Sequence, residues 1–278
     1  MAQFNIEITP PAFPVASGSS SRDVTRLQEW LVVRGFDVGI DADADPHSAV
    51  AAGIDGQFGN GTKRGCDAFA AANGLTSGTV NEAFWQKLTS GMDTAFSFRS
   101  TKPNVSDAIV ETAQLHLEQK PLEARRLIGG KLIGKDNSGP WVRAYCLGFS
   151  DEWCQGAASQ WIKQAFAAFG RVPPIALDEP KVMPLFVPSI VEAAKEAGRF
   201  VAGVSTTAVP PGSFFFVKGL LKGVPSHIHV GVTASPIRAN GTFDSIEGNT
   251  NANGSDAGFE VCKRTTRARA SCDFGILA

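Results

Sequence analysis

The chain has 278 residues, of which 43% are hydrophobic and 19% charged, and its formal net charge is −1. This composition is typical of a globular protein with one or two domains, and its balanced charge indicates neither a nucleic-acid nor a membrane partner. No segment reaches the roughly 18 uninterrupted apolar residues that a membrane-spanning helix needs.

The N-terminal segment, residues 1–21, is rich in proline and serine and predicts a leader arm. It lacks the basic start, apolar run and cleavage site of a secretory signal. We therefore expect synthesis in the cytoplasm.

Three helices are predicted next. Val24, Leu27 and Leu31 are spaced three and four apart, which indicates a helical face that ends at Gly35. A second helix is expected over 60–73 and a third near 79–88, with the glycine-rich turn "IDGQFGNGT" before the second. The prediction is a three-helix domain over residues 22–91.

This segment resembles the peptidoglycan-binding domain family. The resemblance covers about a quarter of the chain and is carried by Leu27, Gln28, Leu31 and Gly35, the "IDGQFGNGT" turn, Phe69, Asn73 to Leu75, Trp85 and Leu88. It implies a ligand groove near the turn, with Asp55, Gly56, Gln57 and Phe58 as candidate cell-wall-binding residues. Gly56 and Phe58 could equally shape the turn and the core.

An acidic insertion, residues 41–54, makes this segment longer than the family pattern. Asp41, Asp43 and Asp45 alternate like the start of a calcium loop, but Pro46 and Ala52 occupy the places where an EF-hand needs Gly and Glu. We interpret the insertion as a solvated loop and predict no metal site.

Residues 92–105 are polar and predict a linker. Residues 106–278 predict a second domain, with helical patterns first and then strand-like segments such as "GSFFFVK" and "SHIHVGVTA". This order is typical of an α+β fold with an antiparallel sheet. Cys262 and Cys272 flank a possible hairpin, where they could face each other in a disulfide.

A single cysteine, Cys154 in "SDEWCQGAASQWI", precedes what the pattern predicts to be the first turn of a helix. The N–H groups at a helix N-terminus stabilise a thiolate, so this position suits a nucleophile, although buried inert cysteines are common. A catalytic cysteine also needs a base, and the base needs a group that orients it.

Four histidines are available as the base. His47 lies in the acidic insertion and His116 in a predicted helix, where solvated or structural roles are expected. His227 and His229 are two apart in a predicted strand, which places them on one face. Downstream, Glu247 and Asn249 are also two apart, and either could accept the imidazole N–H.

The second half of the chain, from residue 125 to the end, resembles the CHAP family, the cysteine, histidine-dependent amidohydrolases and peptidases. The resemblance is carried by "GKDNSGPWVRAY", "EWCQGAASQWIKQAF", "PPGSFFFV", "HVGVT" and "IEGNTN". It implies a papain-like fold without metal or cofactor, with Cys154, His229, Glu247 and Asn249 as catalytic residues. His229 is preferred to His227 because Gly231 provides the small residue that the family pattern places two positions after the histidine.

Together the two resemblances imply a monomeric peptidoglycan hydrolase that resembles a modular phage endolysin. Without a secretory signal, such an enzyme would act on the cell wall only after release from the cytoplasm by another route. It would cleave either the N-acetylmuramoyl-L-alanine amide or a bond of the stem peptide, which the sequence leaves open. The candidate substrate-binding residues are Asp136, Asn137, Trp153 and His227; Trp153 is equally suited to packing.

The sequence is compatible with three alternatives. The "HIH" pair suits a zinc endopeptidase, but the His and Asp four residues apart that such enzymes supply upstream are missing after His47 and His116. A non-catalytic wall-binding protein is the second alternative. A secreted antibacterial amidase, in place of a phage enzyme, is the third.

Overall fold

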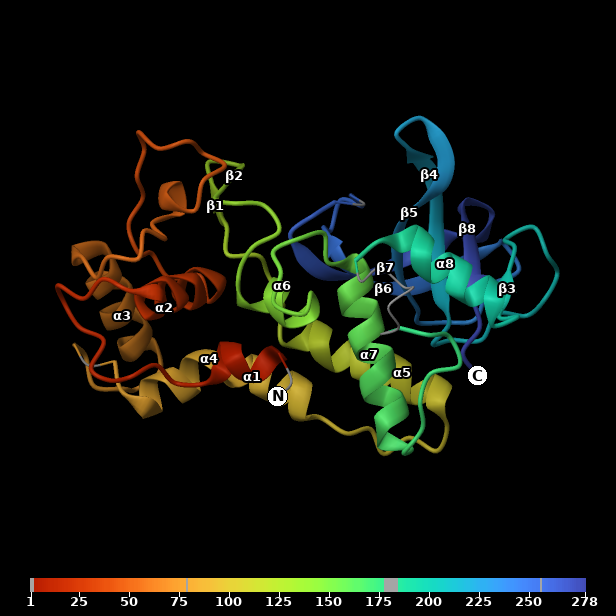
Figure 1. Cartoon of the computed structure of the whole chain (residues 1–278), viewed down its shortest axis with the longest axis horizontal. Helices are drawn as coiled ribbons and strands as arrows, with labels where there is room; N and C mark the ends of the chain where they lie inside the picture. Colours follow the sequence, from red (N-terminus) through yellow and green to blue (C-terminus); the bar gives the residue numbers. More distant parts are fainter. Residues whose placement is uncertain (1–2, 79, 178–184, 256) are drawn as a thin grey trace. The chain divides into compact units, whose positions relative to one another are not determined.

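The computed structural model describes residues 3–78, 80–177, 185–255 and 257–278. It contains two compact units, Met1–Thr94 with Pro121–Ser150, and Ala95–Lys120 with Asp151–Ala278 (Figure 1). Both units are discontinuous in sequence, whereas the predicted domains, 22–91 and 106–278, are continuous. Residues 121–150, expected in the second domain, belong to the first unit.

The first unit is mainly helical. Its helix α2 begins after Ser21, whose side chain accepts a hydrogen bond from the Val24 N–H, and it buries the predicted face. The described elements that begin in this unit are α1 (Gln3–Ile8), α2 (Arg22–Val33), η1 (Val50–Ala52), α3 (Asn60–Ala72), α4 (Glu82–Ser97), β1 (Arg126–Ile128), β2 (Lys131–Ile133) and α6 (Pro140–Tyr145).

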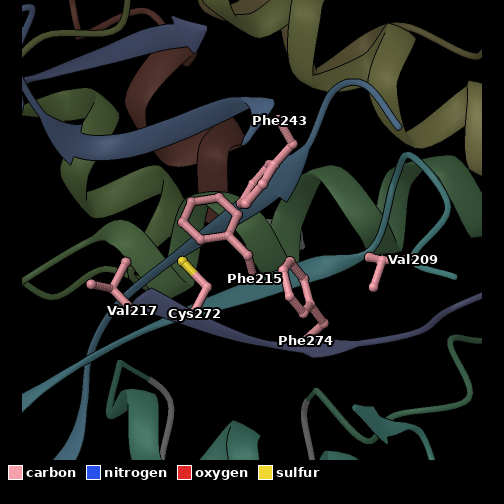
Figure 2. Close-up of a cluster of buried hydrophobic side chains, with 6 residues drawn as sticks. All are labelled: Val209, Phe215, Val217, Phe243, Cys272 and Phe274. Carbon is pink, nitrogen blue, oxygen red and sulfur yellow. The ribbon is translucent and has the colours of Figure 1, made fainter. Parts of the chain in front are cut away.

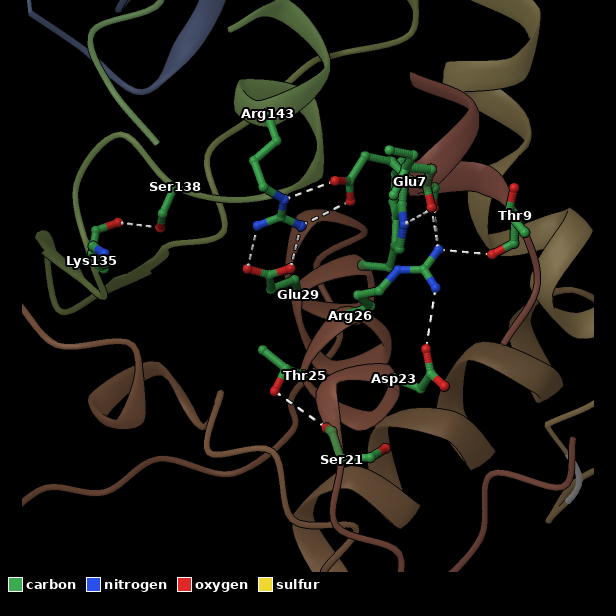
Figure 3. Close-up of polar contacts among 12 residues, drawn as sticks. Glu7, Thr9, Ser21, Asp23, Thr25, Arg26, Glu29, Lys135, Ser138 and Arg143 are labelled. Atoms are coloured by element: carbon green, nitrogen blue, oxygen red, sulfur yellow. Dashed lines mark hydrogen bonds and ion pairs between the residues drawn. The ribbon is translucent and has the colours of Figure 1, made fainter. Parts of the chain in front are cut away.

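The N-terminal segment differs from the predicted leader arm, because residues 3–8 form a helix that packs on α6. Arg143 of α6 donates two hydrogen bonds of 2.8 Å to the carboxylate of Glu7, and it binds Glu29 of α2 as well (Figure 3). Arg26 donates to the carbonyls of Ile6, Glu7 and Thr9 at the end of α1. These contacts hold the segment in the unit, and proline and serine content alone did not reveal them.

The second unit is α+β, as predicted. Its six strands form one antiparallel sheet in the order β3-β8-β4-β5-β6-β7, and α7 packs on β5 and β6 while α5 packs on α7. The elements are α5 (Val105–Glu118), α7 (Cys154–Ala168), α8 (Val187–Glu196), β3 (Phe200–Val201), β4 (Phe214–Leu221), β5 (Val224–Thr233), β6 (Thr242–Thr250), β7 (Glu260–Ala268), η2 (Arg269–Ser271) and β8 (Cys272–Gly275).

The centre of the sheet is buried on both faces. One face carries an apolar cluster that Figure 2 shows, formed by Val209, Phe215, Val217, Phe243, Cys272 and Phe274. Val230, Val232 and Ile246 are fully buried on the other face. Because the sheet has no solvated face here, polar side chains in its centre need partners within the protein.

The suggested disulfide between Cys262 and Cys272 is not formed, and both thiols are free. Cys262 lies in β7, at one edge of the sheet, whereas Cys272 lies in β8, beyond β6, β5 and β4. The segment between them therefore joins strands that are not neighbours, and it does not make the hairpin that would bring the thiols together.

Candidate catalytic site

Helix α7 begins at Cys154, which is buried with 3% of its surface exposed. The preceding residue, Trp153, is fully buried. A Cβ at Gly248 of β6 would lie 3.1 Å from the Trp153 ring and 2.7 Å from the Ala157 Cβ, so glycine permits the close approach of α7 to β6. This contact places the cysteine beside the central strands.

His229 and Glu247 form a buried pair on the two strands beneath α7. The His229 Nε2 lies 3.0 Å from the Glu247 Oε2, and neither side chain is exposed. Among the described residues, β5 and β6 pair at Val232 with Ile246 and at Thr233 with Ser245. The side-chain contact between His229 and Glu247 thus links β5 to β6 at a point where the two backbones no longer pair.

The other imidazole nitrogen of His229, Nδ1, is buried and has no hydrogen bond of ordinary geometry. Burial alone would lower the pKa of His229, but interactions with Cys154 and Glu247 outweigh it and raise the pKa to about 9. Cys154 and Glu247 therefore both favour the imidazolium. Cys154, His229 and Glu247 thus follow one another in the order that a nucleophile, a base and an orienting carboxylate would require.

A β-bulge in β5 places the two neighbouring histidines on opposite faces of the sheet. His229 pairs with Val217 of β4, but His227 pairs with Lys218, because β5 carries one extra residue at this point. Consecutive residues of β4 face opposite sides of the sheet, so the two histidines also face opposite sides. The prediction that they share a face is therefore wrong.

Glu247 is held by three groups that the sequence analysis missed. Arg267 donates from Nε to Oε1 at 2.8 Å and from Nη2 to Oε2 at 2.6 Å, and the Ser245 hydroxyl donates to Oε1 at 2.5 Å. The Arg264 Nε lies 3.5 Å from Oε2. Burial opposes ionisation, but Arg267 and His229 hold the pKa of Glu247 well below its usual range.

The register of β6 and β7 explains why these groups were missed. Phe243 pairs with Arg267 and Ser245 pairs with Arg264, so an irregularity places both arginines on the face that carries Glu247. In a regular strand, residues three apart would face opposite sides. The only signal in the sequence was the spacing of basic residues in "KRTTRAR", and it does not reveal the irregularity.

Asn249 lies beside this site but does not join it through a hydrogen bond to His229. The pairing of β6 with β7 is irregular between Glu247 and Thr250, and Asn249 has a left-handed backbone with φ of 55°. Its carbonyl accepts from the Gly258 N–H at 2.9 Å. Glu247 is therefore the residue that contacts the imidazole.

The predicted substrate-binding residues are distributed over both units. His227 belongs to the second unit, where its Nε2 lies 2.9 Å from the Asp273 Oδ2. Asp136 and Asn137 belong to the first unit, where Asp136 pairs with Arg125 at 2.8 Å. Their contact with substrate stays a prediction, and the complete burial of Trp153 matches the packing alternative.

The predicted wall-binding turn is organised by Gln28. Its Nε2 donates to the Asp55 carboxylate at 2.7 Å and to the Gln57 carbonyl at 3.0 Å, and its Oε1 accepts from the Gly56 N–H at 2.8 Å. Phe58 is buried in the core. Asp55 and Gln57 line a cavity of about 280 Å³ that also reaches Arg64.

The remaining candidate ligands do not form a metal centre in the part of the chain that the structure describes, where no group of three or more His, Cys, Asp or Glu residues is arranged for a metal ion. The bulge also turns His227 and His229 away from each other, so they do not form the His-x-His pair of a zinc site. In the insertion, Asp41 and Asp45 accept from the backbone N–H two residues ahead.

Comparisons with protein-family models, curated proteins and solved structures find no match for this chain. Among the described helices, none has the length and apolar character that a membrane crossing demands.

Proposed function

We propose that the protein is a cysteine-dependent peptidoglycan hydrolase that cleaves an amide bond. The observation that carries the proposal is the interaction of Cys154, at the start of α7, with His229 of the buried His229–Glu247 pair. The resemblance of the second half of the chain to the CHAP family supports the same chemistry and a papain-like arrangement. The resemblance of residues 22–91 to peptidoglycan-binding domains indicates that the substrate is peptidoglycan.

The proposed reaction has two steps, the formation of a thioester on Cys154 and its hydrolysis. The Cys154 thiolate attacks the carbonyl carbon, N–H groups at the start of α7 stabilise the oxyanion, and the His229 imidazolium protonates the leaving amine as the C–N bond breaks. Neutral His229 then takes a proton from water, the hydroxide attacks the thioester, and the acid product leaves. Glu247 keeps the imidazole oriented and stabilises its charged form.

The first unit would hold the enzyme on the insoluble wall. Binding to the polymer raises the effective concentration of the catalytic unit near the bonds it cuts. The cavity beside Asp55 and Gln57 is the candidate contact, and Gln28 holds the turn that forms it.

The test is the loss of turbidity of purified sacculi with wild-type protein and with Cys154→Ala, each with and without a chelator. We expect wild-type lysis that survives chelation and disappears in the variant, and mass analysis of the fragments then identifies the bond. Lysis by Cys154→Ala would refute the mechanism. Tight binding of sacculi by the wild type without any lysis would favour a non-catalytic wall-binding protein.

A second measurement reports on the thiol without any substrate. Burial raises the pKa of Cys66 and Cys262 to about 12 and that of Cys272 to about 11, so these thiols are protonated at neutral pH. We expect iodoacetamide to alkylate Cys154 ahead of these three at pH 7. His229→Gln should slow that labelling, since it removes the imidazolium beside the thiol.

A further inference from the structure

A cavity of about 460 Å³ in the second unit borders the segments that carry the candidate catalytic residues. Glu152, which precedes Cys154 by two residues, lines it, as does Ile228, which directly precedes His229. Ser255 lines it from the loop that follows β6. Cys154 and His229 are not part of this lining, so a substrate bound in the cavity would reach the reacting atoms past Glu152 and Ile228.

The rest of the cavity wall is largely apolar. The start of α8 contributes Phe186, Val187 and Pro188, and the β4–β5 hairpin contributes Leu220 and Leu221. Figure 1 shows this hairpin projecting beyond the remainder of the sheet. An apolar wall leaves sugar hydroxyls without hydrogen bonds but suits an aliphatic side chain, so it favours a peptide over a glycan.

His227 provides a fixed polar group in this wall. It also lines an adjoining cavity of about 330 Å³. Asp273 accepts from the Gly203 N–H at 2.8 Å and lies 2.9 Å from the His227 Nε2, while the imidazole ring is 6.0 Å from the Phe216 ring and 6.5 Å from the Phe200 ring. The orientation of the ring is therefore set before substrate binds.

The Asp273 contact also determines which hydrogen bond His227 can offer. A carboxylate only accepts, so Nε2 carries the proton that lies between the two groups. In the neutral ring Nδ1 is then an acceptor. The ligand group that matches it is a peptide N–H.

We propose that this cavity determines specificity for the residue next to the scissile bond. It takes an uncharged aliphatic side chain against Leu220 and the start of α8, while His227 accepts a hydrogen bond from a substrate N–H. The inference rests on the proposed function and deepens it, since it assigns the peptide, and not the glycan, to this side of the bond.

The test compares two positions on one hairpin. Leu220 lines the cavity and is 66% exposed, whereas Val224 is 63% exposed and is not part of the lining. The substrates are synthetic peptides built around the bond that fragment masses identify in digested sacculi, with Ala or Glu at each flanking position in turn. The readout is kcat/KM of Leu220→Lys, Val224→Lys and the wild type.

We expect the wild type and Val224→Lys to prefer Ala over Glu at one flanking position. Leu220→Lys should lower kcat/KM for the Ala peptide by about tenfold, and it should narrow or reverse the preference because lysine attracts glutamate. His227→Phe should raise KM for the Ala peptide more than it lowers kcat. Alkylation of Cys154 by iodoacetamide should keep its wild-type rate in both Leu220→Lys and His227→Phe.

Equal preferences for Ala over Glu in Leu220→Lys and Val224→Lys would overturn the inference. Lysis of sacculi by the wild type would leave the proposed function intact in that case. A wild type that lyses no sacculi and cleaves no peptide would refute the proposed function and this inference together.

Discussion

Arg267 holds the carboxylate of Glu247 with two hydrogen bonds, of 2.8 and 2.6 Å, while the same carboxylate contacts His229. Glu247 is fully buried, so its charge depends on these partners. The charge of the candidate catalytic pair is thus maintained by a residue of β7 that lies 113 positions from Cys154 in the sequence.

Replacement of Arg267 should damage both stability and activity. Arg267→Gln leaves the buried Glu247 without its two charge-assisted hydrogen bonds, and we expect the free energy of unfolding to fall by about 3 kcal/mol. Arg264→Gln is the matched control, since the Arg264 Nε lies 3.5 Å from the carboxylate. Urea unfolding and sacculus lysis measure the two effects; equal losses in both variants would contradict this role of Arg267.

Loss of the Glu247 charge should affect catalysis more than folding. Glu247→Gln keeps the size of the side chain but removes the negative charge that favours the His229 imidazolium. We expect kcat to fall by roughly 10⁴, the loss found when the carboxylate of a catalytic triad becomes an amide. The measurement is the rate of peptide release from sacculi. Activity within about threefold of wild type would show that Glu247 does not orient the base.

Stability and activity should both decline on the alkaline side. The pKa of His229 in the folded protein, about 9, lies above its ordinary value of 6.5. Its contribution to stability is therefore complete below pH 6.5 and is lost as the pH rises through 9. Activity should decrease over the upper part of this range, as the imidazolium that protonates the leaving amine disappears.

The measurement is urea unfolding at several pH values from 6 to 10, with His229→Gln as the control that removes this titration. We expect the wild type to lose more stability than the variant over the interval. Identical pH dependence in the two proteins would contradict the raised pKa. Initial rates of sacculus lysis over the same interval report on the catalytic consequence.

The N-terminal helix should contribute strongly to the stability of the first unit. Arg143→Met leaves Glu7, which is 2% exposed, and Glu29 without their shared cation, so we expect a loss of about 3 kcal/mol in the free energy of unfolding. Lys63→Met, which breaks an exposed pair with Asp67, should change stability little. Proteolysis at residues 3–8 should accelerate only in Arg143→Met.

Wall binding should depend on the exposed side chain of Gln57. In the full chain carrying Cys154→Ala, Gln57→Ala should weaken binding to sacculi by about threefold to tenfold, the effect of one lost hydrogen bond. Gln86→Ala is the control, since Gln86 is exposed on α4 and does not line the cavity. Sedimentation with sacculi measures the affinity; equal binding by both variants would remove the turn from the contact.

The sequence by itself determined the local features of the chain. The spacing of Val24, Leu27 and Leu31 predicted α2, and the position of Cys154 before an apolar helical pattern predicted its place at the start of α7. The α+β class followed from the order of helical and strand-like segments. These properties depend on residues within a few positions of one another, so a short segment contains the information that specifies them.

Only the tertiary structure decided which of these residues meet. One extra residue in β5 turns His227 away from His229, and the irregular pairing of β6 with β7 brings Arg264 and Arg267 to Glu247. The side-chain period of a strand is two, so a shift by one residue exchanges its faces. That shift is set by packing between segments far apart in the chain, and local sequence patterns do not encode it.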